Sequence, residues 1–215
     1  MLSLRFAAGD QIHLLCLGAH SDDIEIGCGG TILRLVESYP HVSVRWLVFA
    51  ANTTRRAEAI ASAGLFLQHA RDKRVDVMAF RDGFFPYVGG EIKEVFEGLK
   101  SEPPPDIVFT HYRHDRHQDH RVISDLAWNT FRNHLILEYE IPKYDGDLGS
   151  PNFFVTLDEA VVERKIGAIL SSFQSQSGKQ WFSDDTFRAL LRLRGIESNA
   201  PSRYAEAFYA RKVSL

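Results

Sequence analysis

The sequence predicts an α/β protein in which a mostly parallel, Rossmann-like sheet carries helices on both faces. Three observations lead to this class. Short apolar segments alternate with segments of helical spacing, which is the pattern of βαβ units with right-handed crossovers. The composition is 45% hydrophobic and 25% charged, as in ordinary globular proteins. A chain of 215 residues also suits one large core, so we predict a single domain over residues 1–215.

The first strand is expected at residues 12–17, a short apolar run closed by Gly18. In the helix that follows, apolar residues recur at helical spacing from Ile32, so Thr31 is a candidate cap and Pro40 a stop. A second strand should cover residues 42–50. The inner face of the second helix is predicted to consist of Ala57, Ile60, Ala61, Gly64 and Leu65.

The same alternation continues in the second half of the chain, although it loosens after Pro142. The remaining strands are expected at residues 74–80, 106–110, 135–141, 153–157 and 207–213. The remaining helices are expected at residues 92–99, from about 121 to 130, at 159–173 after a cap at Asp158, and at 187–194. Residues 143–152 should form a loop, and the polar stretch 171–179 is a candidate cover for a site.

Charge and cysteine content exclude several classes of protein. The net charge of -3 and a pI near 6.3 give no basic footprint for a nucleic acid or an anionic membrane surface. The longest early apolar segment, residues 12–19, has no cationic region before it and ends at charged residues, so we expect neither a signal peptide nor a membrane span. Cys16 and Cys28 lack the spacing of a metal or redox pair. A cytoplasmic protein is therefore expected.

The segment His111–His120 holds four of the nine histidines in ten residues. It follows a predicted buried strand and precedes a predicted helix, so it lies at the carboxyl end of a strand, where open α/β sheets bind ligands. Imidazole is a common ligand for zinc and other transition metals. The alternative is a solvated polar loop, although such loops are seldom this rich in histidine.

The first strand ends in a glycine-rich segment that invites comparison with a dinucleotide-binding turn. That turn brings bare backbone close to an anionic pyrophosphate, whereas here Asp22 and Asp23 occupy the place of the anion. Two carboxylates beside a histidine suit a cation instead. The alternative for this segment alone is a capped helix start in which the carboxylates bind backbone amides.

Parallel strands bring these two segments to the same edge of the sheet, which predicts one catalytic zinc ion per chain. We expect His20, Asp23 and His120 as its ligands, with a water molecule in the open position. Binding only one carboxylate leaves the ion positive, which lowers the pKa of that water toward neutrality. Asp22 is then free to act as the general base. The ligand types do not exclude iron or another divalent metal.

The other polar residues of the histidine run are assigned supporting roles. His117 lies three residues before His120, so both should project from one helix face, and protonated His117 would donate a hydrogen bond to the oxyanion. Asp119 and Asp115 are candidates to orient that histidine. His111 and His114 are expected to frame the site or lie at the surface, because the ligand count is already met.

Two motifs in this chain resemble the signatures of the LmbE-like (PIG-L) N-acetylglucosaminyl deacetylases. The family carries Ala-His-Pro-Asp-Asp near its N-terminus and His-Pro-Asp-His after a later strand, and this chain has Ala-His-Ser-Asp-Asp at 19–23 and His-Gln-Asp-His at 117–120. Ser21 and Gln118 replace prolines that supply no metal-binding group. The resemblance implies a zinc hydrolase that removes an acyl group, usually acetyl, from amino sugars, with His20, Asp23 and His120 binding zinc.

The resemblance also implies contacts to the substrate outside the two motifs. It places Arg55 or Arg56 on a substrate-facing loop after the second strand and Asp82 next to sugar hydroxyls. A Tyr-Ala-Glu segment near the C-terminus resembles one that often lies near the family's pocket, which makes Glu206 a candidate contact. The alternatives are ordinary charged loop residues and, for Glu206, an ion pair with Arg203.

These observations predict a metal-dependent N-deacetylase that acts on a small N-acylated amino sugar or glycoconjugate. One alternative is a protein that binds metal or sugar without turnover. The other is a nucleotide-dependent Rossmann-like enzyme, which the carboxylates at the first strand end disfavour. The sugar, its aglycone, the acyl group and the oligomeric state are left open by the sequence.

Overall fold

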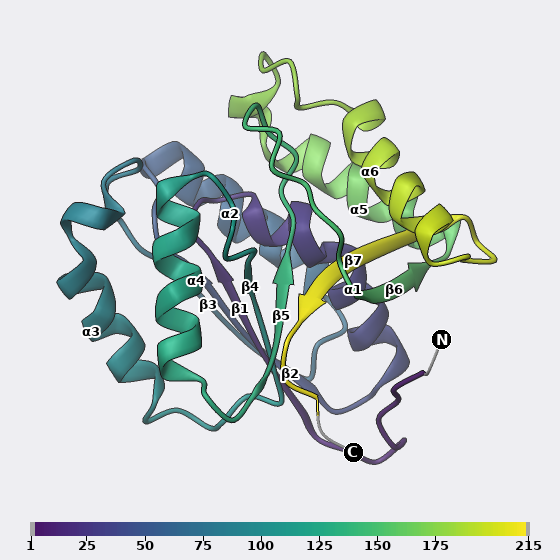
Figure 1. Ribbon diagram of the computed structural model, residues 1–215, viewed down its shortest axis with the longest axis horizontal. Coiled ribbons are helices and arrows are strands. Elements are labelled where there is room, and N and C mark those ends of the chain that lie inside the picture. The colour runs from purple at the N-terminus through teal and green to yellow at the C-terminus, as the bar shows by residue number, and fades with distance from the viewer. Residues whose placement is uncertain (1–2, 214–215) are drawn as a thin grey trace.

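A computed structural model describes residues 3–213 and contains one seven-stranded sheet (Figure 1). The strand order is β3-β2-β1-β4-β5-β7-β6. The strands are β1 (Ile12–Gly18), β2 (Val42–Val48), β3 (Asp72–Val77), β4 (Ile107–His111), β5 (Leu135–Tyr139), β6 (Phe153–Leu157) and β7 (Tyr204–Ala210). The five strands from β1 to β5 are parallel, whereas β7 lies antiparallel between β5 and β6. The mostly parallel sheet is therefore confirmed.

Helices cover both faces of this sheet, as predicted. They are α1 (Asp23–Ser38), α2 (Thr53–Phe66), α3 (Gly89–Leu99), α4 (Gln118–Thr130), α5 (Glu159–Ser172) and α6 (Asp184–Glu197). One apolar core layer packs residues of α3 and α4 against the sheet, including Phe96 and Ile123. The other layer gathers residues of α1, α2 and α5, including Phe66 and Ile166. In Figure 1, α3 and α4 lie together on the left of the sheet, and α5 and α6 lie at the upper right.

Helix α1 begins at Asp23, eight residues before the predicted cap Thr31. Glycines in the first half of this helix weaken the helical signal of the sequence, but in the folded protein they are positions of close packing. A Cβ on Gly27 would lie 2.2 Å from the Tyr139 ring, and one on Gly29 would lie 2.5 Å from Phe66. Glycine has a low helix propensity, but here only a residue without a side chain lets the helix approach its neighbours.

The predicted inner face of α2 is also corrected. Ile60 and Leu65 are about half exposed, and the buried face consists of Ala59, Ser62, Ala63 and Phe66. Apolar residues at helical spacing exist on both faces of this helix, so periodicity alone selected the wrong one. Helix α4 begins at Gln118 rather than near Arg121, and β7 begins three residues before the predicted closing strand.

Two predictions about the whole chain stand unchanged. The single domain over residues 1–215 stays a prediction, and residues 1, 2, 214 and 215 lie outside the described range. No helix between residues 3 and 213 has the length and apolar character needed to cross a membrane. The cytoplasmic location also stays a prediction.

Candidate metal centre

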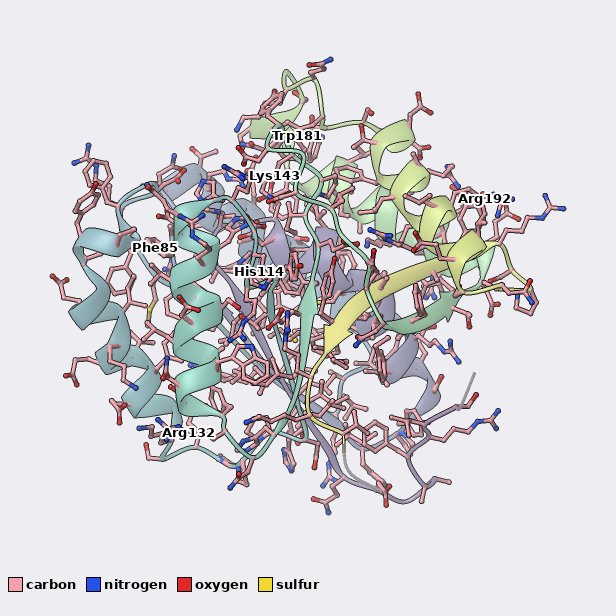
Figure 2. The ribbon with its side chains drawn as sticks, in the orientation of Figure 1. Phe85, His114, Arg132, Lys143, Trp181 and Arg192 are labelled. Atoms are coloured by element: carbon pink, nitrogen blue, oxygen red, sulfur yellow. The ribbon has the colours of Figure 1, made fainter. Side chains whose placement is uncertain are left out.

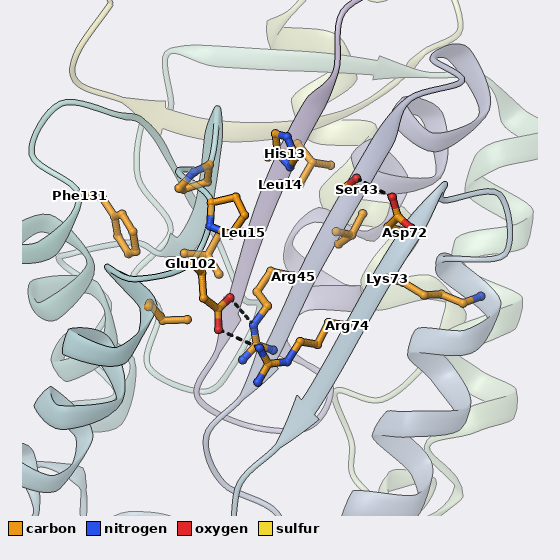
Figure 3. A pocket seen from close by; sticks show the side chains of 14 residues that line it. His13, Leu14, Leu15, Ser43, Arg45, Asp72, Lys73, Arg74, Glu102 and Phe131 are labelled. Atoms are coloured by element: carbon orange, nitrogen blue, oxygen red, sulfur yellow. Dashed lines mark hydrogen bonds and ion pairs between the residues drawn. The ribbon is translucent and has the colours of Figure 1, made fainter.

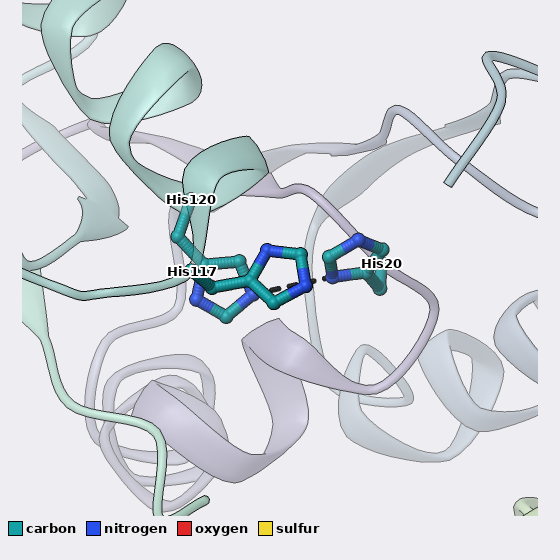
Figure 4. A group of neighbouring side chains, drawn as sticks. All are labelled: His20, His117 and His120. Carbon is teal, nitrogen blue, oxygen red and sulfur yellow. Dashed lines mark hydrogen bonds between the residues drawn. The ribbon is translucent and has the colours of Figure 1, made fainter. Parts of the chain in front are cut away.

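The parallel pairing of β1 with β4 brings the two polar motifs together. His20 follows the carboxyl end of β1, and Asp22 and Asp23 occupy the N-cap and first position of α1. His117 is the N-cap of α4, and His120 lies in its first turn. Two helix N-termini therefore meet at the edge where the strands end. Figure 4 shows the rings of His20, His117 and His120 next to one another.

The three predicted ligands converge on one point. His20 Nδ1 lies 3.2 Å from His120 Nε2 and 3.4 Å from Asp23 Oδ2, and His120 Nε2 lies 3.5 Å from Asp23 Oδ1. A tetrahedral zinc site with bonds of about 2.0–2.1 Å separates its ligand atoms by roughly 3.3–3.4 Å. The donor set therefore fits a zinc ion in both chemical type and spacing.

Carboxylates hold the outward-facing nitrogen of each candidate histidine ligand. Asp115 Oδ2 lies 2.9 Å from His120 Nδ1. Asp119 Oδ2 and Asp82 Oδ1 lie 3.3 Å and 3.1 Å from His20 Nε2. Such contacts place the N–H outward and direct the lone pair of the other nitrogen into the site.

This arrangement corrects the predicted partners of His117. Asp115 orients His120, and Asp119 faces His20 and accepts hydrogen bonds from the backbone N–H groups of Gly83 and Phe85. The reason is the early start of α4, which puts Asp119 within the first helical turn and turns its carboxylate toward the loop after β3. Asp119 is thus a link between that loop and a candidate ligand.

The ionisable groups perturb one another strongly. Burial alone would raise the pKa of Asp23, but His120, His111 and His20 together hold it well below its usual range. Burial, followed by His111, lowers the pKa of His120 to about 3 against the opposing effects of Asp23 and Asp115. Burial also acts to lower the pKa of His20, yet Asp23, Asp119 and Asp82 outweigh it and raise that pKa. The centre therefore holds an ionised carboxylate, a neutral His120 and a proton on His20 that a metal ion would displace.

Asp22 is 5% exposed and lies beside an arginine. Arg55 Nη2 donates to its Oδ1 at 2.8 Å. Burial raises the pKa of Asp22, while Arg55 opposes that change. Arg56, the other candidate at this position, donates to the carbonyl of Val77 on β3 instead. Of the two arginines, the structure brings only Arg55 to the cluster.

His117 stands beside the candidate ligands, and its ring lies close enough to His20 and His120 for these three imidazoles to form a candidate metal-binding group as well. Its ring centroid lies 4.8 Å from His20 and 4.6 Å from His120. Its Nδ1 accepts the backbone N–H of Asp119 at 3.3 Å, which leaves a hydrogen on Nε2 of the neutral ring. Burial and then His20 lower the pKa of His117. The neutral ring is therefore the donor here, whereas the sequence led us to expect the protonated one.

His111 and His114 separate into a buried and an exposed residue. His111 ends β4, is fully buried, and its Nε2 accepts the backbone N–H of Ala19 at 2.9 Å. Its ring stacks on His120 at 3.9 Å. Because that amide occupies the lone pair of Nε2, His111 supports the site by packing against His120 and not as a ligand. His114 is exposed and contacts Tyr112 edge to face.

Asp82 and Glu206 are placed very differently by the structure. Asp82 is exposed, lies at the edge of the cluster and contacts His20. Glu206 is 3% exposed on β7, and its carboxylate is taken up by Lys165 and by the backbone of α1. We therefore correct the prediction that Glu206 contacts substrate, because both of its oxygens are already bonded inside the protein.

A cavity of about 330 Å³ lies at the other end of the sheet (Figure 3). It is lined by the first residues of β1, β2 and β3 and by Glu102 and Phe131. Two of its charged side chains, Arg45 and Arg74, pair with Glu102. In Figure 2, Arg132 marks this end and Lys143, which contacts Asp115, lies toward the opposite end. The candidate centre and this cavity are thus separate.

Sequence reasoning missed two contributors to the centre. Lys143 donates to Asp115 at 2.8 Å and to Asp147 at 2.9 Å. The pairing of Arg55 with Asp22 was also unexpected. Lys143 lies on an irregular segment whose path has no sequence period.

The fold and the cluster define an α/β protein with a candidate metal centre at the carboxyl ends of its strands. The family model described as PIG-L, GlcNAc-PI de-N-acetylase, matches residues 15–131, and the chain belongs to this family. The match contains both motifs. The resemblance inferred from the sequence is therefore confirmed, and the chain is a member of a family of deacetylases.

Known relatives and solved structures extend this result. The chain is 27% identical over 151 residues to the uncharacterized deacetylase YaiS of Escherichia coli K12, covering 65% of this chain and 80% of the relative. Its fold is similar to that of the N,N'-diacetylchitobiose deacetylase of Pyrococcus horikoshii, with a TM-score of 0.66, 22% identity and coverage of 96% and 87%. It is also similar to the 4-carboxy-2-hydroxymuconate hydratase GalB of Pseudomonas putida, with a TM-score of 0.66, 16% identity and coverage of 95% and 98%. At these identities the two structures show the fold alone.

Proposed function

We propose that this protein is a zinc-dependent N-deacetylase that hydrolyses the N-acetyl group of an amino sugar or a small conjugate of one. The observation that carries this proposal is the approach of His20 Nδ1, His120 Nε2 and the two oxygens of Asp23, with contacts of 3.2 to 3.5 Å, beside a buried carboxylate. Membership of a deacetylase family supports the reaction class.

The metal would be held by His20 Nδ1, His120 Nε2 and the Asp23 carboxylate, with one ion per chain. When bound, a zinc ion supplies a Lewis acid that lowers the pKa of water and polarises a carbonyl oxygen. The same ligand types also bind other divalent transition metals. That the bound ion is zinc is therefore part of the proposal. Asp115 and Asp119 keep the two imidazole lone pairs directed inward.

Asp22 serves as the general base. Its buried carboxylate takes a proton from the attacking water, and its raised pKa makes it a better proton acceptor than an exposed aspartate. Arg55 fixes the direction of that carboxylate through the 2.8 Å contact. The new bond joins the water oxygen to the acyl carbon, and the proton on Asp22 passes to the amine nitrogen as the carbon–nitrogen bond breaks.

His117 acts on the opposite side of the acyl group. The Nε2–H of its neutral ring donates to the oxygen that gains negative charge as water adds to the carbonyl. Acetate and a free amino sugar are the products. Arg55, which contacts Asp22, and the exposed Asp82, which contacts His20, are the proposed contacts to the sugar. A small glycoconjugate is the proposed class of substrate, with no part for nucleic acid.

The test is an assay of acetate release from N-acetylglucosamine, N,N'-diacetylchitobiose and lipid-linked or nucleotide-linked N-acetylglucosamine. Asp22→Asn is expected to lower kcat by about 100- to 10,000-fold and to retain the metal, because only the base is lost. His120→Ala is expected to lose the metal, and elemental analysis of protein purified without chelator measures this directly.

The alternatives predict other outcomes. Sugar binding by calorimetry without acetate release from any substrate would favour a non-catalytic binding protein. A thermal shift with NAD or S-adenosylmethionine would favour a nucleotide-dependent enzyme. Hydration of 4-carboxy-2-hydroxymuconate, with no acetate release, would place the chain with the hydratase that shares its fold.

A further inference from the structure

A buried ion pair bonds to three backbone groups in the interior of helix α1. In a regular α-helix the N–H of Gly30 would bond to the carbonyl of Ile26, four residues earlier. Here Gly30 N–H donates to Glu206 Oε1 at 2.7 Å, and the Ile26 carbonyl accepts from Lys165 Nζ at 2.7 Å. The Thr31 N–H donates to Glu206 Oε2 at 2.7 Å.

The two residues of this ion pair belong to two other elements of the fold. Lys165 belongs to α5 and Glu206 to β7, and each side chain is 2% exposed. Lys165 Nζ lies 2.6 Å from Glu206 Oε1, so the two side chains bond to each other as well as to the helix. A carboxylate that accepts two backbone N–H groups and an ammonium is fully satisfied, which is the condition for keeping charges buried.

The absence of a side chain at Gly30 leaves room for the Glu206 carboxylate beside the helix backbone. A Cβ at this position would lie 2.9 Å from Glu206 Oε1 and 2.5 Å from Leu157 Cδ1. Any side chain would therefore push the carboxylate away from the helix backbone. Gly30 lies within the continuous helix Asp23–Ser38, with a short segment of α1 before it and a longer one after it.

The short segment carries the chemistry. Asp22 and Asp23 lie about two helical turns before Gly30, at the N-terminal end of that segment. We infer that Lys165 and Glu206 act as a positioning pair, which sets the placement of this segment and hence of Asp22 and Asp23 relative to His20 and His120. This inference rests on the proposed function.

Positioning matters here because the tolerance is small. The Asp23 carboxylate lies 3.4 Å and 3.5 Å from two imidazole nitrogens held by other elements. Slipping the first two turns of α1 along the helix axis would open both distances together, and a misplacement of about 1 Å at a reacting group costs roughly 100-fold in rate. The pair bonds the helix backbone about two turns from Asp23 and so adds to the contacts that fix that axial position.

The first test replaces Lys165 by Met and uses Arg45→Met as a control. The Arg45 side chain is 14% exposed and pairs with Glu102 at 2.9 Å in the cavity at the other end of the sheet. We expect Lys165→Met to weaken Co²⁺ binding about 10- to 100-fold, the cost of losing a supporting contact at a metal site, and to change the visible spectrum of the cobalt protein. We expect kcat to fall about 100-fold with KM within about twofold. Arg45→Met should leave the spectrum, Co²⁺ affinity and kcat unchanged in the folded protein.

A second variant covers the case in which Lys165→Met does not fold. Gly30→Ala keeps both charges and favours the helix, but it displaces the carboxylate. Gly64→Ala in α2 is its control, since a Cβ there meets nothing within 4 Å. We expect Gly30→Ala to speed amide exchange at Gly30 and Thr31 and to weaken Co²⁺ binding about 10-fold, whereas Gly64→Ala should do neither.

These readouts separate the two proposals. If the wild type released no acetate from any substrate but Gly30→Ala and Lys165→Met changed the cobalt spectrum, the proposed function would fail and the positioning pair would stand. A cobalt spectrum, Co²⁺ affinity and kcat equal to wild type in both variants would overturn the positioning pair.

Discussion

The two ends of the sheet both gather charged side chains, but they use them in different ways. Toward the amino end, Arg45 and Arg74 each contact both Glu102 and Asp76, at 2.6 to 3.1 Å, so these four charges face ones of opposite sign. At the carboxyl end the carboxylates face histidines that lie close enough together to hold a metal ion. The first group is therefore a set of closed ion pairs, whereas the second is a candidate site for a cation.

Breaking a contact at the carboxyl end is expected to have the larger effect. Asp115→Asn weakens the acceptor that holds His120 Nδ1 at 2.9 Å, so zinc affinity should fall about 10- to 100-fold. Competition with a chromogenic chelator measures the affinity. Asp147→Asn is the control, because Asp147 also contacts Lys143 and the backbone of Arg116 but no candidate ligand. Equal zinc affinity in Asp115→Asn and wild type would contradict the assigned role.

Glu25 extends the comparison of the two ends, because it is a buried carboxyl group that pairs with neither an arginine nor a histidine in the part of the chain that the structure describes. It is fully buried, and within residues 3–213 its oxygens have no hydrogen-bond partner. Burial raises its pKa well above the usual range, with smaller contributions from Asp22 and Asp23. The unfolded chain loses this proton near pH 4.3, whereas the folded chain keeps it to higher pH, so the free energy of unfolding falls as pH rises between the two values.

Glu25→Gln removes this loss of stability. In chelator-treated protein, the variant should match wild type below about pH 4 and become more stable as pH rises, by about 1.4 kcal/mol for each unit of pKa displacement. Urea unfolding at several pH values measures the difference. A stability difference that is the same at every pH would show that Glu25 does not titrate differently in the two states.

The smallest effect is expected at the amino end. Glu102→Gln removes one of the two acids that bind Arg45 and Arg74. Because these side chains are partly exposed, the free energy of unfolding should fall by about 1 kcal/mol or less, and by less still in high salt. Acetate release should not change. A drop in kcat in this variant would show that the two ends of the sheet are coupled.

The sequence predicts the alternating fold and the clustering of His20, Asp23 and His120, because apolar strands are readable and parallel strands bring their carboxyl ends together. It does not predict which histidine Asp115 and Asp119 hold. That depends on α4 starting at Gln118 and on the backbone of the loop at Gly83, and neither has a periodic signal.

Glu206 illustrates a second limit. A short motif identifies the residue but not the direction of its side chain, which depends on β7 pairing antiparallel with β6 and on the gap that Gly30 leaves in front of the carboxylate. The start of α1 was missed for a related reason. Glycines lower the helix signal of a sequence, whereas in the folded protein they are what lets that helix pack closely.

The position of β7 has a consequence for how this protein matures during synthesis. β7 fills the place between β5 and β6, and its Glu206 bonds the backbone of α1 at a residue 176 positions earlier in the chain. Contacts this distant in sequence form late. On a ribosome, the two aspartates at the start of α1 are made early, but the helix that carries them is locked only after the last strand has emerged. We expect a nascent chain lacking residues 204–210 to hold every candidate metal ligand and still lack an assembled centre.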